Sequence, residues 1–204
     1  MNVIDFERYK QQRRRTLEQN RILGLEEKLE DRLMQAMQAL SENKYNSHNS
    51  HMDGLDALGY ELLFYDPQNV LGLVGRAYGI CKYDLERCAK YMEDAFASDA
   101  HKGIATSSFL HLADRYKYNW RLVSSEKVIP AIGFSLEHFT DDERVMEITL
   151  RLALHFRNFD IGGMIRGAYN SLRELNSDAA ESYEAAVNLS VRQSPKLKLV
   201  RGEK

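Results

Sequence analysis

The sequence predicts an all-α protein in which antiparallel helix pairs form a right-handed stack. Three observations lead to this fold class. Apolar residues recur every three or four positions along nearly the whole chain, whereas alternation by two is nowhere sustained. The 204 residues include only 3 prolines and 12 glycines, so helices can continue uninterrupted and hairpin turns lack their usual residues. The helices that open successive pairs are also spaced at similar intervals.

The spacing of the helix pairs indicates stacking. Pairs are expected to begin near residues 70, 103, 142 and 178, which gives intervals of about 33, 39 and 36 residues. Stacked helix–turn–helix repeats have periods of this length, because one pair is too thin to bury its own apolar face. The alternative is an irregular helical bundle with coincidental spacing, and we favour the repeat.

Four segments follow from composition and patterning. Residues 1–42 are expected to form a basic N-terminal segment and a long amphipathic helix with an apolar stripe from Ile22 to Leu40. Residues 43–53, rich in Asn, Ser and His, are expected to form a polar linker. The helical repeats should cover residues 54–191, and residues 192–204 should form a basic flexible tail.

Local signals predict where individual helices begin and end. Asp66 and Pro67 should end one helix, because proline disfavours helical backbone before it. Pro130 predicts a late helix start or a kink. A capping box should begin at Thr140, and Ser177 should cap the final helix.

The long N-terminal helix needs a partner for its stripe, because a helix with six exposed apolar positions is unfavourable in water. The stripe formed by Leu55, Leu58 and Leu62 offers a facing surface in the same chain. We therefore favour packing of the helix on its own body. A homodimer through residues 22–40 is the alternative.

One helix pair carries a recognisable pattern of large, small and aromatic residues: Leu71, Val74, Gly75, Tyr78, Cys88, Met92 and Ala95. This pattern resembles the tetratricopeptide repeat (TPR) superfamily, and the later pairs follow it mainly by their period. A glycine at 75 lets two helices approach closely while larger side chains fill the space beside it. The resemblance implies a protein-binding groove lined by the first helix of each pair.

Candidate groove residues follow from this resemblance and from the helical stripes. The resemblance places four exposed positions of the first helix in the groove: Asn69, Gly72, Arg76 and Gly79. The stripes of the later pairs add His111, Arg115, Arg151 and His155. A groove with several arginines suits an acidic or phosphorylated protein segment. The alternative is that these residues are ordinary solvent-exposed helix positions.

The two chain ends are basic, although the formal net charge of the whole chain is −2. Near the N-terminus the candidate nucleic-acid contacts are Arg13, Arg14 and Arg15. In the tail they are Lys196, Lys198 and Arg201. Arginine binds phosphate through its charge and through paired N–H donors. The alternative, which we favour, is that both ends are solvated and aid solubility.

The sequence does not indicate catalysis, a metal or a cofactor, because it contains no nucleotide-binding, zinc-protease or nucleophile motif. Cys81 and Cys88 lie in helical patterns and are expected to be reduced core residues. His48 and His51 have a His-x-x-His spacing before Asp53, but they fall in the expected polar linker. We expect a protein without enzymatic activity.

These observations favour a cytoplasmic scaffold that binds another protein as an adaptor, chaperone or regulator. No stretch approaches the length of a membrane span, and the N-terminus lacks an apolar signal core. The alternative function is a regulator that contacts nucleic acid through the basic ends.

Overall fold

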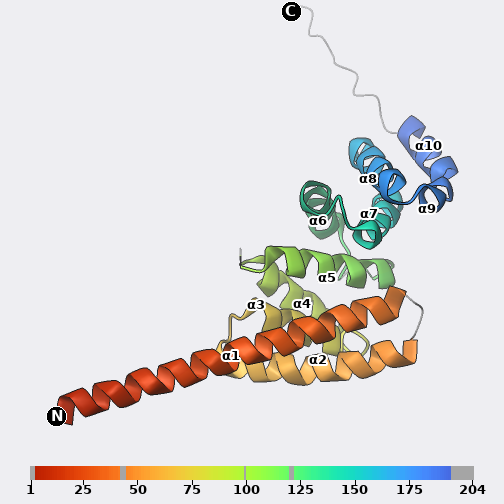
Figure 1. The fold of residues 1–204 in the computed structure, drawn as a ribbon. Coiled ribbons are helices and arrows are strands. Elements are labelled where there is room, and N and C mark those ends of the chain that lie inside the picture. Colours follow the sequence, from red (N-terminus) through yellow and green to blue (C-terminus); the bar gives the residue numbers. More distant parts are fainter. Residues whose placement is uncertain (1–2, 42–44, 99, 120–121, 194–204) are drawn as a thin grey trace, which may run out of the picture. The chain divides into compact units, whose positions relative to one another are not determined.

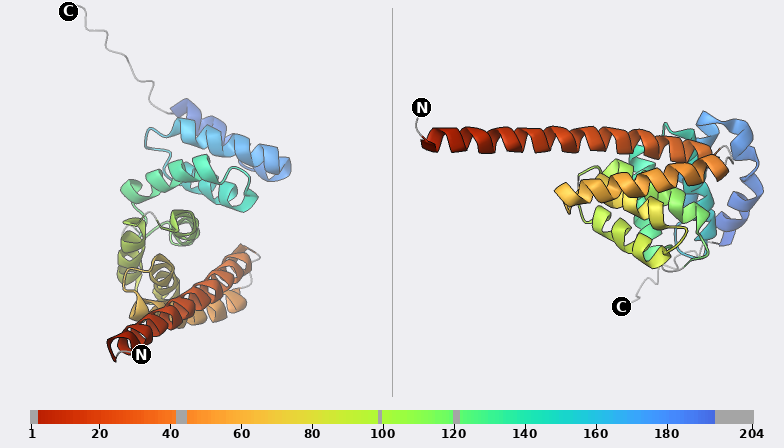
Figure 2. Two further views of the ribbon diagram at one scale, coloured as in Figure 1. Left: turned by 60° about the vertical axis from the view of Figure 1, so that its left-hand side comes forward. Right: turned by 90° about the horizontal axis from the view of Figure 1, so that it is seen from below.

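The computed structural model describes the backbone of residues 3–41, 45–98, 100–119 and 122–193. Over these ranges the chain has ten helices and no strand, which confirms the all-α prediction (Figure 1 and Figure 2). The helices are α1 (Val3–Ser41), α2 (Tyr45–Tyr65), α3 (Val70–Ile80), α4 (Leu85–Phe96), α5 (Lys102–Arg115), α6 (Ser125–His138), α7 (Glu143–His155), α8 (Gly162–Leu175), α9 (Ser177–Glu181) and α10 (Glu184–Gln193).

The chain divides into two compact units, residues 1–108 and residues 109–204, with the boundary inside α5. The helices expected to open successive pairs begin at Val70, Lys102, Glu143 and Ser177. Each start lies within one residue of the predicted position, because each apolar stripe begins directly after a polar turn. The spacing of the helices is therefore confirmed.

In the first unit, α2 and α3 approach each other closely through glycines. A Cβ atom added to Gly59 would lie 2.7 Å from the backbone oxygen of Gly72. One added to Gly75 would lie 2.7 Å from Leu29 Cδ1 and 3.0 Å from the backbone oxygen of Leu55. We call this the glycine contact (Gly59, Gly72 and Gly75). The prediction that Gly75 lies at a close helix–helix contact is confirmed, and the neighbours are α2 and α1.

Helix α1 covers the first unit with the C-terminal part of its length. Leu25, Leu29 and Leu33 are each at most 7% exposed, and Ala36 is fully buried. Figure 2 shows α1 running beside α2 and extending beyond it toward the N-terminus. The prediction that this stripe packs on its own body is confirmed from Leu25 to Ala36, and the side chain of Leu40 lies outside the described residues. A homodimer through residues 22–40 would have to use the opposite, exposed face of α1.

The predicted polar linker over residues 43–53 is corrected by the structure, because α2 already begins at Tyr45. Asparagine and serine favour loops since their side chains compete for backbone hydrogen bonds. Here burial outweighs that preference. Met52 is fully buried and continues the stripe of Leu55 and Leu62 by one further turn.

Polar side chains mark the helix ends around α3. Helix α2 ends at Tyr65, before Pro67, as predicted. Asn69 and Asp84 cap α3 and α4, each accepting a backbone N–H of the helix with its side-chain oxygen. Tyr78 is fully buried in α3, and its hydroxyl donates a hydrogen bond of 3.2 Å to a backbone carbonyl of α5.

In the second unit the predicted cap of α7 is corrected. Asp142 caps this helix by accepting the Val145 N–H at 3.0 Å, so the capping box beginning at Thr140 is not formed. Aspartate competes well for this position because its charge also interacts favourably with the helix dipole. In the same unit, the buried hydroxyl oxygens of Ser135 and Thr149 lie 2.8 Å apart and form a hydrogen bond between α6 and α7.

Three other features of the second unit also differ from expectation. Asn176, and not Ser177, caps α9 by accepting a backbone N–H with its side-chain oxygen. The expected final helix is two helices, since α9 ends at Glu181 and α10 begins at Glu184. Pro130 lies inside α6, which begins at Ser125, so the predicted late helix start is wrong, and the alternative of a kink stays a prediction.

Replacing Gly59 by alanine should destabilise the first unit, because the new Cβ would overlap the backbone of α3 and separate the two helices. We expect the free energy of unfolding in urea to fall by about 1–3 kcal/mol. Gly24 in α1 is the matched control, since a Cβ there meets nothing within 4 Å. Gly24→Ala should stabilise by about 0.5–1 kcal/mol. Equal effects at both positions would contradict the glycine contact.

Alkaline pH should destabilise the first unit through its buried acids. Burial, with smaller contributions from nearby Cys81 and Asp84, raises the pKa of Cys88 above its ordinary 9.0. Burial also raises the pKa of Tyr78 well above its ordinary 10.0. Above pH 9 the unfolded chain therefore binds fewer protons than the folded chain, so the free energy of unfolding should fall as pH rises. Cys88→Ala should lessen this fall between about pH 9 and 10, and an unchanged slope would contradict the assignment.

Candidate functional site

One face of α2 presents polar and aromatic residues toward solvent. Asp53, Asp56, Tyr60 and Phe64 follow each other at intervals of three or four residues, which places them on the same side of the helix. Tyr60 is 66% exposed and Phe64 is 75% exposed. We call these four residues the α2 strip.

Arg76 of α3 lies against the α2 strip. Its Nη1 is 2.6 Å from Asp56 Oδ1, and its guanidinium is 5.6 Å from the Tyr60 ring centroid and 5.7 Å from that of Tyr91 in α4. The side chain of Arg76 is only 16% exposed. The sequence placed Arg76 in a groove that would bind an acidic or phosphorylated protein segment. In the structure Arg76 holds Asp56 and Tyr60 in place, and its charge is already neutralised.

A second cation, Lys82, lies beside Asp53 at the N-terminal end of the α2 strip. Lys82, in the turn after α3, forms an ion pair with Asp53 at 3.0 Å. Its ammonium is 4.8 Å from the ring centroid of Tyr83, which is strongly exposed. The surface around the strip therefore combines exposed aromatic rings with internally paired charges.

The other predicted groove positions of the first unit have structural roles. Asn69 is buried at the N-terminus of α3, where its side chain accepts the Gly72 N–H at 2.9 Å and donates to Glu26 at 2.6 Å. Gly72 and Gly79 face α2, and a Cβ at Gly79 would overlap Asp56. These residues do not line an open groove.

The predicted residues of the second unit are partly drawn into an ion-pair network. Arg151 donates to Asp114 at 2.8 Å and 3.2 Å and to Glu147 at 2.7 Å. Tyr183 also donates to Glu147, at 2.8 Å. Partial burial lowers the pKa of Arg151, but its hydrogen bonds and the negative charge of Asp114 outweigh this effect and raise the pKa. Arg151 therefore stays charged and engaged within its own unit.

The remaining candidates in the second unit differ in exposure. His111 is buried and Arg115 is half-buried, both on α5. His155 is exposed at the end of α7, where its ring meets the rings of Tyr118 and Phe156 edge-on. Of these three, His155 is the residue that a partner could reach without rearrangement.

The basic N-terminal residues lie on an uncovered part of α1. Every residue from 11 to 20 is helical and exposed, including Arg13, Arg14 and Arg15. We call residues 11–20 the α1 arm. The tail candidates fall outside the residues that the structure describes: Lys196, Lys198 and Arg201.

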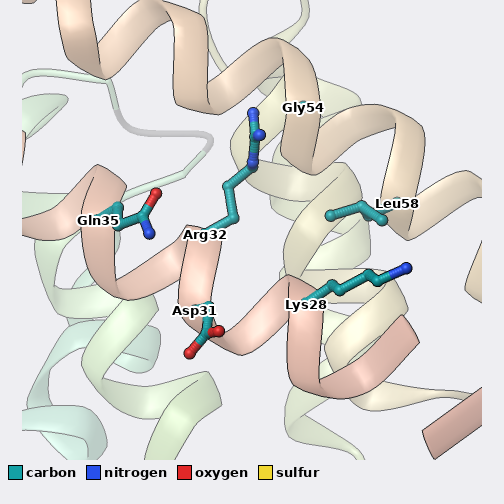
Figure 3. Close-up of a pocket in the computed structure, with 6 residues that line it drawn as sticks. All are labelled: Lys28, Asp31, Arg32, Gln35, Gly54 and Leu58. Atoms are coloured by element: carbon teal, nitrogen blue, oxygen red, sulfur yellow. The ribbon is translucent and has the colours of Figure 1, made fainter. Parts of the chain in front are cut away.

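A pocket that the sequence did not reveal lies between α1 and α2 (Figure 3). Its volume is about 350 Å³, and its lining residues are Lys28, Asp31, Arg32, Gln35, Gly54 and Leu58. The four α1 residues occupy one side, and Arg32 points toward Gly54 on α2. A Cβ at Gly54 would overlap the Arg32 guanidinium, so the missing side chain is what admits the arginine.

The spacing of Lys28, Arg32 and Gly54 is visible in the sequence. Whether Lys28 and Arg32 of α1 come together with Gly54 of α2 depends on how the two helices align. Periodicity alone does not fix that alignment.

Both cysteines are buried free thiols, and the raised pKa of Cys88 keeps it protonated at neutral pH. Among the described residues, no group of three or more His, Cys, Asp or Glu side chains is placed to hold a metal ion. In the same part of the chain, no helix has both the length and the apolar character to cross a membrane.

No family model, curated protein or solved structure matches this chain. The tetratricopeptide resemblance of the α3–α4 pair therefore stays a prediction from its residues.

Proposed function

We propose that this chain is a TPR-like helical scaffold that binds another protein, as an adaptor, chaperone or regulator. The observation that carries the proposal is the α2 strip, where Tyr60 and Phe64 stand exposed one helical turn apart. The regular starts of the helix pairs support the TPR-like part of the proposal.

The chemistry of the strip suits a protein partner. Tyrosine and arginine are enriched among the residues that contribute most to protein–protein binding. An aromatic ring such as that of tyrosine also buries much area while fixing only two side-chain torsions. Arg76 and Asp56 neutralise each other beside Tyr60, so a partner that covers the strip leaves no isolated charge without water. The strip can thus act as a prearranged apolar anchor within a polar rim.

The double variant Tyr60→Ser, Phe64→Ser should lose its protein partner, because it removes both exposed rings of the strip. We expect at least about a tenfold loss of the captured protein in a quantitative crosslinking pull-down from the source organism, which corresponds to about 1.4 kcal/mol. The matched control is Tyr118→Ser, Leu189→Ser, which removes two exposed apolar side chains from the second unit. Circular dichroism should show that both variants fold.

Full capture by the strip variant, or equal losses in both variants, would contradict the assignment of binding to the α2 strip.

The α1 arm favours a second candidate function, contact with nucleic acid. Its three adjacent arginines are exposed, and among the described residues none of them forms an ion pair. Three cations fanned around a helix can follow a phosphate backbone, which makes binding strongly salt-dependent.

Replacing Arg13, Arg14 and Arg15 by glutamine tests this second function with a 20-nucleotide single-stranded RNA. If the arm binds RNA, the triple variant should reduce the slope of log affinity against log salt by about 2. A variant of Arg144, Arg157 and Arg166, which are exposed in the second unit, controls for the change in charge. Equal slopes in the two variants would reject the arm as the contact.

A further inference from the structure

Three cations follow one another along the side of α1 that borders α2: Arg21, Lys28 and Arg32. The facing positions of α2, in antiparallel order, are Glu61, Leu58 and Gly54. Arg21 donates to Glu61 at 2.8 Å across this border. Farther along this border the facing α2 residues, Leu58 and Gly54, are not acidic, and the Arg32 side chain occupies the space that a side chain at Gly54 would take (Figure 3).

Arg32 is half-buried, yet within the described part of the chain it forms neither an ion pair nor a hydrogen bond with another side chain. Two other half-buried arginines are matched by acids, Arg76 by Asp56 and Arg151 by Asp114. A guanidinium that has lost part of its water without gaining an anion is a favourable partner for one.

The pocket around Arg32 sets the charge and shape of its ligand. Lys28 and Arg32 contribute two positive charges and Asp31 one negative charge, so the lining has a net charge of about +1. Figure 3 shows the Asp31 carboxylate directed away from Arg32. Leu58 adds an apolar side chain to the lining. A ligand with one negative charge and a short apolar stem fits this combination.

We propose that the α1–α2 pocket binds an acidic side chain of a partner protein, with the carboxylate held by Arg32 and Lys28. A carboxylate matches the paired N–H donors of a guanidinium. Its methylene groups would contact Leu58. A phosphate group, with a charge of about −2, would exceed the charge of the lining and meet the field of Asp31.

This inference deepens the proposed protein-binding function, although it concerns a different face of α2. Gly54 and Leu58 lie one turn apart on the side toward α1, whereas the α2 strip lies on another side of the helix. The two surfaces can therefore be tested separately.

The test uses the full chain and N-acetyl-tetraglutamate amide as the probe, with tetraglutamine amide as the neutral control. Binding is followed by fluorescence anisotropy of labelled peptide and by the Arg32 side-chain Nε–Hε signal in NMR. We expect tetraglutamate to shift that signal and Arg32→Gln to weaken binding at least about tenfold, as loss of a charge-assisted contact does. Arg32→Lys should recover part of the affinity, because it restores charge without the paired donors.

Arg87→Gln is the matched control, because Arg87 is an exposed arginine on α4 outside the pocket. It should bind tetraglutamate as the unchanged chain does. The double variant of Tyr60 and Phe64 should also keep tetraglutamate binding. If only that variant loses a cellular partner, the loss is assigned to the α2 strip, and the proposal for the pocket is unaffected.

Three results would overturn the proposal. The first is equal binding of tetraglutamine, and the second is unchanged binding by Arg32→Gln. The third is a shift of the Arg32 signal by glutarate but not by tetraglutamate, which would identify a free small carboxylate as the ligand. If Arg32→Gln fails to fold, the NMR signal of the unchanged chain and the affinity of Arg32→Lys still decide between these results.

Discussion

The close approach of α2 and α3 at Gly59 and Gly75 is the constraint on which the first unit depends. Because no side chain separates the two backbones here, Leu29 of α1 can reach the surface of α3 directly. The same approach brings Arg76 within 2.6 Å of Asp56. The glycine contact therefore positions both the core of the unit and the charges beside the α2 strip.

Much of this fold follows from local sequence signals. The starts of α3, α5, α7 and α9 were predictable because polar turns precede clear apolar stripes. The role of Gly75 was also predictable, since a small residue among large ones indicates a close contact. The first turns of α2 were missed, because the burial of Met52 outweighs the loop preference of its polar neighbours.

The candidate site was less predictable, because it depends on which side chains meet across helices. The sequence drew attention to Arg76, but its pairing with Asp56 depends on the close packing of α2 against α3. The meeting of Arg32 with Gly54 depends in the same way on the alignment of α1 with α2. Exposure of the α1 arm could not be read from its charges alone, since half-buried arginines with paired acids also occur in this chain.

Native-state amide hydrogen exchange tests the central claim about the first unit most directly. The account predicts that the amides around Gly59 and Gly75 exchange only with global unfolding, because the glycine contact holds α2 and α3 together. It also predicts that residues 11–20 exchange almost as fast as an isolated helix, because nothing in the described chain covers them. Early exchange of α2 and α3, or equal protection of residues 11–20, would contradict the account.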